Sequence, residues 1–295
     1  MAGTRRHDNE IAVDEGLARR LLQAQFPEWA DLGLVLVEPS GTDHTIFRLG
    51  HEMVVRFPVM EYATRQAAKE ARWLPFLAPQ VPLALPVPLA MGEPGEGYRW
   101  NWSIVSWIEG QQARADNLDP IPAALDLARF IRALQACDPT DGPPAGADTG
   151  QRGLPVRVWV DAVAHYAEPM KDDPFIRRAL EVWHEALEVP DWDRPPVWFH
   201  GDLSGNLIAR EGRLVGAIDS GYGIGDPACD LMPGWILFRG EARQVFFDKV
   251  GLDEATQERA RGWALGPALI GMGYYRKVPH LLANCRGSIE GALAE

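Results

Sequence analysis

The stretch HGDLSGNLIAREGRLVGAIDSGYGIGDPACDL, residues 200–231, places two carboxylates and one amide around a predicted strand, turn and strand. The apolar run 197–199 leads into this stretch, and a hairpin through 210–212 turns the chain back along 213–219. Asp219 is therefore expected beside Asp202 and Asn206. This arrangement suits phosphoryl transfer, which needs a carboxylate to orient a hydroxyl and oxygen ligands to hold Mg²⁺.

Each of the three side chains has a distinct role in that geometry. Asp202 would accept or orient the proton of the substrate hydroxyl. Asn206 and Asp219 would hold Mg²⁺ on the β and γ phosphates of a nucleotide, with Asp219 as the main ligand. Two acids alone are equally compatible with ordinary loop carboxylates, so features elsewhere in the chain have to decide between the two interpretations.

The N-terminal half predicts an antiparallel sheet of five strands with one helix inserted. Short apolar or β-branched runs separated by turn residues indicate three strands, and two more follow a helix over 64–77. The predicted strands are 34–38, 45–49, 53–57, 87–91 and 102–107. A further helix is expected after Asp14, which can cap it.

A two-lobed nucleotide kinase needs a flexible loop over the phosphates, a cationic side chain on the third strand and a carboxylate on the following helix. This half of the chain has a candidate for each of the three. Arg56 lies on the third strand and Glu70 on the following helix. Taken singly, the two would be an ordinary exposed ion pair. Their occurrence in order before the HGD, Asn and Asp residues favours the kinase interpretation. The loop residues expected at the phosphates are Ser40, Gly41, Thr42 and Thr45.

The C-terminal half is predicted to be mainly helical, with helices over 121–136, 156–167 and 174–187. The proline- and glycine-rich segment 139–153 is expected to be a surface loop that lines or covers a site. We place the boundary between the halves in a hinge over 106–111, at Gly110.

Several residues within 200–231 are expected to be structural. His200 would hydrogen-bond the backbone and shape the loop, and Asp226 would cap a helix. Asp230 would brace the catalytic loop through its backbone. The glycines at 221, 223 and 225 do not fit a dinucleotide fingerprint and predict a permissive turn.

The composition limits the partners and the compartment. The 29 Lys and Arg residues against 41 Asp and Glu give a net charge of −12, which argues against nucleic-acid or anionic-membrane binding and favours cationic partners. The three cysteines include no CxxC pair, so a reducing cytoplasm is the simplest expectation. We expect no signal peptide and no membrane span.

With these parts in order, the chain resembles the aminoglycoside phosphotransferases, small-molecule relatives of the protein kinases, over nearly its full length. HGDLSGN is similar to the catalytic loop of that family, IDSG to its metal-binding segment and GDPACDL to its continuation. The resemblance implies an α+β, two-lobed, protein-kinase-like fold, with a nucleotide-binding lobe over 1–107 and a mainly helical catalytic and acceptor-binding lobe over 108–295. It also implies that the backbone of Ser106, Trp107 and Ile108 binds the purine.

The chain departs from that family at three positions. Its strand cation is Arg56 where kinases usually have Lys, so the phosphates would meet a planar fork instead of a point charge. Asp202 and Asn206 are four residues apart, one fewer than usual. Ser220 follows Asp219 where the family often has Trp.

The function expected from the residues and the resemblance together is transfer of a phosphoryl group from ATP or GTP, with Mg²⁺, to a hydroxyl of a small molecule. An aminoglycoside is the leading acceptor, because a cationic acceptor suits an acidic protein. Macrolides, choline, homoserine and methylthioribose stay open as acceptors, and fold does not dictate substrate. Two different functions also stay open, that of a nucleotide-binding pseudokinase and that of a two-metal hydrolase. The protein would be a monomer or a homodimer.

Overall fold

The computed structural model describes residues 11–38, 43–219 and 221–294 of the chain. The chain divides into two compact units, which comprise residues 1–79 with 84–109 and residues 80–83 with 110–295. Ser40, Gly41 and Thr42 of the expected phosphate loop lie outside the described residues, as does Ser220.

The first unit is built on a five-stranded sheet in which neighbouring strands are antiparallel, as the sequence predicts. The strand order is β1-β2-β3-β5-β4, so β3 lies at the centre. Strand bounds differ from the predicted ones by two residues or fewer. They are β1 (Leu34–Leu36), β2 (His44–Leu49), β3 (Met53–Pro58), β4 (Pro88–Gly92) and β5 (Trp102–Ser106).

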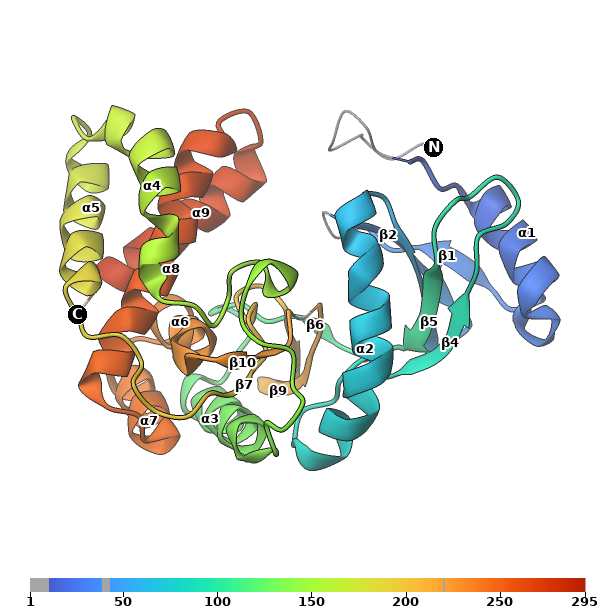
Figure 1. The fold of residues 1–295 in the computed structure, drawn as a ribbon, viewed down its shortest axis with the longest axis horizontal. Helices are drawn as coiled ribbons and strands as arrows, with labels where there is room; N and C mark the ends of the chain where they lie inside the picture. Colours follow the sequence, from blue (N-terminus) through green and yellow to red (C-terminus); the bar gives the residue numbers. More distant parts are fainter. Residues whose placement is uncertain (1–10, 39–42, 220, 295) are drawn as a thin grey trace. The chain divides into compact units, whose positions relative to one another are not determined.

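Two helices lie on opposite faces of this sheet, α1 (Glu15–Gln25) and α2 (Thr64–Leu77) (Figure 1). Asp14 caps α1 by accepting a hydrogen bond from the Leu17 amide at 2.7 Å. Alternate residues of a strand point to opposite faces, so Val55 and Phe57 of β3 pack into the core under α1. Arg56, between them, is directed to the other face, where it meets Glu70 of α2.

The second unit is mainly helical and centres on α8 (Glu254–Tyr274), which packs against several other helices (Figure 1). The predicted helix over 156–167 is divided, because residues Val156–Trp159 form a 3₁₀ turn before α4. In the described part of the chain, no helix combines the length and apolar character that crossing a membrane requires. The remaining helices are α3 (Pro120–Ala136), α4 (Val160–Tyr166), α5 (Pro174–Leu187), α6 (Met232–Ile236), α7 (Gly240–Val250) and α9 (Pro279–Leu293).

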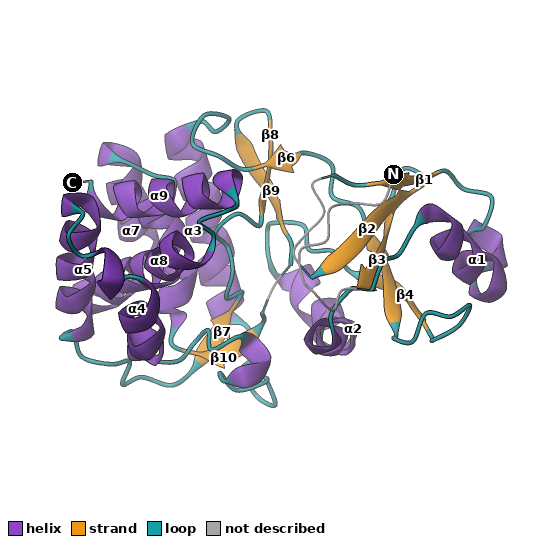
Figure 2. Cartoon of the chain, turned by 90° about the horizontal axis from the view of Figure 1, so that it is seen from above, coloured by secondary structure: helices purple, strands orange, loops and turns teal. Residues whose placement is uncertain are grey.

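Two small sheets carry the loops of the candidate site (Figure 2). One joins β6 (Gln111–Gln112) to the hairpin of β8 (Leu207–Arg210) and β9 (Arg213–Ala217). The other pairs β7 (Val197–Phe199) with β10 (Gly223–Gly225).

Strand β10 corrects the sequence prediction, which made its glycines part of a turn. Gly223 is needed for close packing, since a Cβ atom there would lie 2.8 Å from the Phe199 ring and 2.7 Å from the Thr149 methyl group. A residue without a side chain therefore lets β10 approach β7 and the loop beside it.

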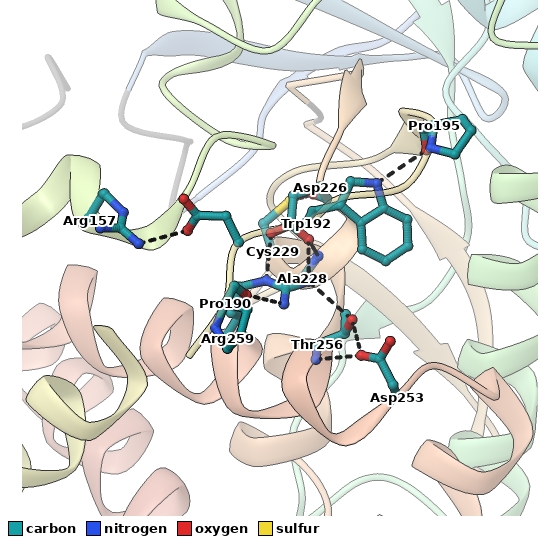
Figure 3. A network of polar contacts seen from close by, with 11 residues as sticks. Arg157, Pro190, Trp192, Pro195, Asp226, Ala228, Cys229, Asp253, Thr256 and Arg259 are labelled. Carbon is teal, nitrogen blue, oxygen red and sulfur yellow. Dashed lines mark hydrogen bonds and ion pairs between the residues drawn. The ribbon is translucent and has the colours of Figure 1, made fainter. Parts of the chain in front are cut away.

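A buried ion pair fixes the residues after β10 to α8 (Figure 3). Asp226 caps the 3₁₀ turn η7 (Pro227–Leu231), as predicted, by accepting from the Ala228 amide at 2.9 Å. It also accepts from Arg259 of α8 at 2.8 Å, and both side chains are at most 4% exposed. Burial raises the pKa of Asp226, and the guanidinium of Arg259 opposes that rise. Arg259 further donates to the Pro190 carbonyl at 2.8 Å, so it joins three segments.

Asp226→Ala should lower the free energy of unfolding by about 3 to 5 kcal/mol, because it leaves the buried Arg259 guanidinium without its carboxylate. Urea denaturation measures this change. Asp191→Ala is the matched control, since it breaks an exposed pair with Arg157 and should cost less than about 1 kcal/mol. Equal effects of the two substitutions would contradict a structural role for the buried pair.

Candidate active site

The turn that follows β7 is held by one buried carboxylate. Asp230 accepts the His200 amide at Oδ2 and the Gly201 amide at Oδ1, each at 2.7 Å. The side chain comes from η7 and its residue is 1% exposed. The predicted brace of the catalytic loop is thereby confirmed. Burial raises the pKa of Asp230 to about 7, against the opposing effect of the two amides.

His200 is a buried, neutral residue that shapes the same turn. Burial lowers its pKa to about 3, although the nearby Asp219 charge acts in the opposite direction. Its Nδ1 atom accepts a hydrogen bond from the Asp202 amide at 3.2 Å, in agreement with the predicted contact to the backbone. A fully buried imidazole of this kind orients the loop and is poorly placed to exchange protons with a substrate.

The β8–β9 hairpin brings Asp202, Asn206 and Asp219 together through backbone contacts. Ile218, just before Asp219, donates its amide to the Asn206 carbonyl at 2.9 Å. The Nδ2 group of Asn206 donates to the carbonyl oxygens of Asp202 at 2.9 Å and Asp219 at 3.5 Å. The amide side chain is therefore held between the two acidic residues.

The orientation of this amide bears on metal binding. Because Nδ2 faces the two carbonyl groups, the Oδ1 atom of Asn206 is directed away from them. Asp219 has a φ of 55°, a left-handed conformation that is unusual for a residue with a side chain and often found at functional sites. An amide oxygen and a carboxylate are hard donors of the kind that Mg²⁺ prefers. The donor types of Asn206 and Asp219 therefore suit Mg²⁺, and their role as metal ligands stays a prediction.

In the first unit, Arg56 and Glu70 form a buried ion pair. Nη1 of Arg56 donates to Oε2 of Glu70 at 2.8 Å, and the two side chains are 8% and 2% exposed. Gln66, one helical turn before Glu70, donates to its other oxygen at 3.0 Å. The pair is not the solvent-facing type considered from the sequence. Its part in nucleotide binding stays a prediction.

Two of the three backbone amides in the segment expected to bind the purine already donate hydrogen bonds within the first unit. Ser106 donates its amide to the Val87 carbonyl at 3.0 Å, and Trp107 donates its amide to the Glu52 carbonyl at 2.7 Å. A purine contact here therefore falls to the Ile108 amide or to carbonyl groups. Thr45, the described member of the expected phosphate loop, lies within β2 opposite Phe57 of β3.

A second loop reaches the turn of residues 200–202, which is the expected catalytic turn, and the residues of this loop were not identified as site residues from the sequence. Nη2 of Arg152 lies 3.8 Å from Oδ2 of Asp202. Arg152 belongs to the segment 139–153, which was expected only to line or cover a site. No local pattern singles out this arginine, because its partner is distant in the sequence.

The chain matches the model of the phosphotransferase enzyme family over residues 36–265. No curated protein sequence matches it. Among solved structures it is similar to the GDP and kanamycin complex of the aminoglycoside phosphotransferase APH(2")-IIIa, with 18% identity, a TM-score of 0.73 and coverage of 93% of this chain and 97% of the other. The macrolide 2'-phosphotransferase MphH from Brachybacterium faecium is 20% identical, with a TM-score of 0.61 and coverage of 96% and 99%.

The family match spans most of the chain, and the fold of both units agrees with it. The chain belongs to the phosphotransferase enzyme family, and its fold is the two-lobed, kinase-like α+β fold.

The raised pKa of Asp230 predicts a pH-dependent stability. A carboxyl group with a higher pKa in the folded than in the unfolded chain binds more protons when folded, so its contribution to stability falls as pH rises. The free energy of unfolding of the wild type, relative to Asp230→Asn, should decrease between about pH 4 and pH 7, by up to about 1.4 kcal/mol per pH unit. Urea denaturation of both proteins across this range tests it. A difference that stays constant, or grows with pH, would contradict the assignment.

Proposed function

We propose that this phosphotransferase transfers the γ-phosphoryl group of ATP or GTP to a hydroxyl group of a small molecule, with an aminoglycoside as the leading acceptor. The observation that carries the proposal is the position of Asn206 between Asp202 and Asp219 on a turn held by Asp230. Phosphoryl transfer needs positioning and charge neutralisation more than covalent chemistry, and these residues can supply both.

In this proposal each residue has one task. Asp202 accepts a hydrogen bond from the acceptor hydroxyl and orients its oxygen toward the phosphorus atom. Asn206 and Asp219 would hold Mg²⁺, which when bound neutralises charge on the β and γ phosphates. Arg56, fixed by Glu70, presents its guanidinium to the phosphates. Ser40, Gly41 and Thr42, with Thr45, would cover them, and the backbone near Ile108 would bind the purine.

The acceptor class is proposed from the solved relatives and from the net charge of the chain. Solved relatives include complexes with kanamycin, gentamicin and streptomycin, and the net charge of −12 favours a polycationic acceptor. A macrolide is the second candidate, because two similar structures are macrolide 2'-phosphotransferases. Similar structures are complexes with GDP, ADP or ATP, which supports nucleotide use without choosing between ATP and GTP.

A coupled nucleotide-consumption assay with ATP and with GTP, across aminoglycosides, macrolides and small amino alcohols, tests the proposal. Turnover that depends on one acceptor class is expected. Nucleotide binding without turnover on any acceptor would indicate a pseudokinase, and release of phosphate without an acceptor would indicate a hydrolase. Either result would overturn the proposed transfer.

Asp219→Ala should abolish Mg²⁺-dependent turnover while the fold survives, because it removes the main metal ligand. The coupled assay measures turnover, and circular dichroism checks the fold. Wild-type turnover in this variant would overturn the metal assignment.

Asp202→Asn should lower kcat by roughly two orders of magnitude or more and spare nucleotide binding, because it removes only the carboxylate that orients the hydroxyl. Steady-state kinetics and nucleotide titration separate the two effects. A parallel loss of nucleotide affinity would count against this role for Asp202.

A further inference from the structure

The loop of residues 139–153, which carries Arg152, pairs with strand β10 of the small β7–β10 sheet. Pro144 pairs with Ile224 of β10 in a parallel bridge. Ala145 donates its amide to the Ile224 carbonyl at 3.0 Å, and Ile224 donates to the Pro143 carbonyl at 2.9 Å. The loop therefore adds an edge to the β7–β10 pair, and β7 leads directly to His200 and Asp202.

The position of Arg152 within this loop is fixed by Thr149. The Thr149 residue is 2% exposed, and its hydroxyl donates to the Arg152 carbonyl at 2.8 Å. The same hydroxyl oxygen accepts the Gly146 amide at 3.0 Å. Gly153, with a φ of 80°, then lets the chain pass the Phe199 ring, which a Cβ atom there would meet at 2.1 Å. Arg152 is thus placed by buried contacts on both sides.

The side chain of Arg152 passes over the catalytic turn. A Cβ atom on Gly201, whose φ is 89°, would lie 3.2 Å from Cβ and 3.3 Å from Cγ of Arg152. The glycine therefore leaves room for the aliphatic part of the arginine. At its end, Nη1 donates to the Gly150 carbonyl at 3.0 Å, and Nη2 lies 3.8 Å from the Asp202 carboxylate.

We propose that Arg152 is a positioning residue for Asp202, whose guanidinium holds the carboxylate in the orientation that receives the acceptor hydroxyl. This inference rests on the proposed phosphotransfer. The positive charge of Nη2, 3.8 Å away, attracts the Asp202 carboxylate, and the position of the guanidinium is itself limited by the Nη1 hydrogen bond to the Gly150 carbonyl. The two side chains are 28% and 38% exposed, so water screens the pair and the effect is moderate.

Steady-state kinetics of Arg152→Gln test the proposal. We expect kcat to fall roughly fivefold while the nucleotide KM stays within about twofold, because the pair acts on the hydroxyl-orienting carboxylate alone. Arg152→Lys should recover most of the loss, since a lysine keeps the charge. Arg157→Gln is the matched control, because Arg157 forms an exposed pair with Asp191, and it should retain wild-type kcat.

A double-mutant cycle shows whether Arg152 acts through Asp202. In the Asp202→Asn background, Arg152→Gln should change the residual kcat by less than about twofold. A kcat of Arg152→Gln within about twofold of wild type, or a roughly fivefold loss that persists without the Asp202 carboxylate, would overturn the inference. Failure of the proposed function is distinguishable, because the wild type itself would then show no acceptor-dependent turnover.

Discussion

The candidate site depends on the pair of hydrogen bonds that Asp230 accepts from the backbone of His200 and Gly201. Both amides are buried, and a buried amide without an acceptor costs free energy comparable to a lost hydrogen bond. One carboxylate satisfies both, and it belongs to η7, which packs against α8. The turn that carries Asp202 is therefore fixed to the helical centre of its unit as well as to β7. The raised pKa of Asp230 is the electrostatic cost of this arrangement.

Backbone hydrogen bonds also connect the segments around this turn. Gly221 donates its amide to the His200 carbonyl at 2.9 Å, and Asp226 donates its amide to the Gly153 carbonyl at 2.9 Å. The turn of residues 200–202, the segment after Asp219 and the loop with Arg152 thus share backbone hydrogen bonds. Small shifts in one segment have to be accommodated by the others, which is the kind of support that a precisely positioned carboxylate needs.

The sequence predicted the helices and turns whose formation depends on residues that are close together in the chain. The helices over 64–77 and 174–187 have the predicted bounds, and the hairpin turn after residue 210 was recognised from its composition. Strand β10 and the contact of Arg152 with Asp202 were missed, because a parallel bridge and a close glycine approach depend on residues distant in sequence. The spacing of Asp202 and Asn206 put the metal role of Asn206 in doubt, and the structure adds that the Asn206 amide donates to the backbone carbonyls of Asp202 and Asp219. Its role as a metal ligand stays a prediction.

The β8–β9 hairpin also limits the insertions and deletions that this part of the chain can tolerate. Its turn residues Glu211 and Gly212 both have positive φ, as a two-residue turn requires, and Arg210 pairs with Arg213. The pairing already shifts register between Ile208 and Ala209. A further inserted residue that is not absorbed by such an irregularity would turn the following side chains to the opposite face and move Asp219 away from Asn206. Changes of chain length between Asn206 and Asp219 should therefore be tolerated at the tip of the hairpin or at this irregularity, and not elsewhere in the two strands.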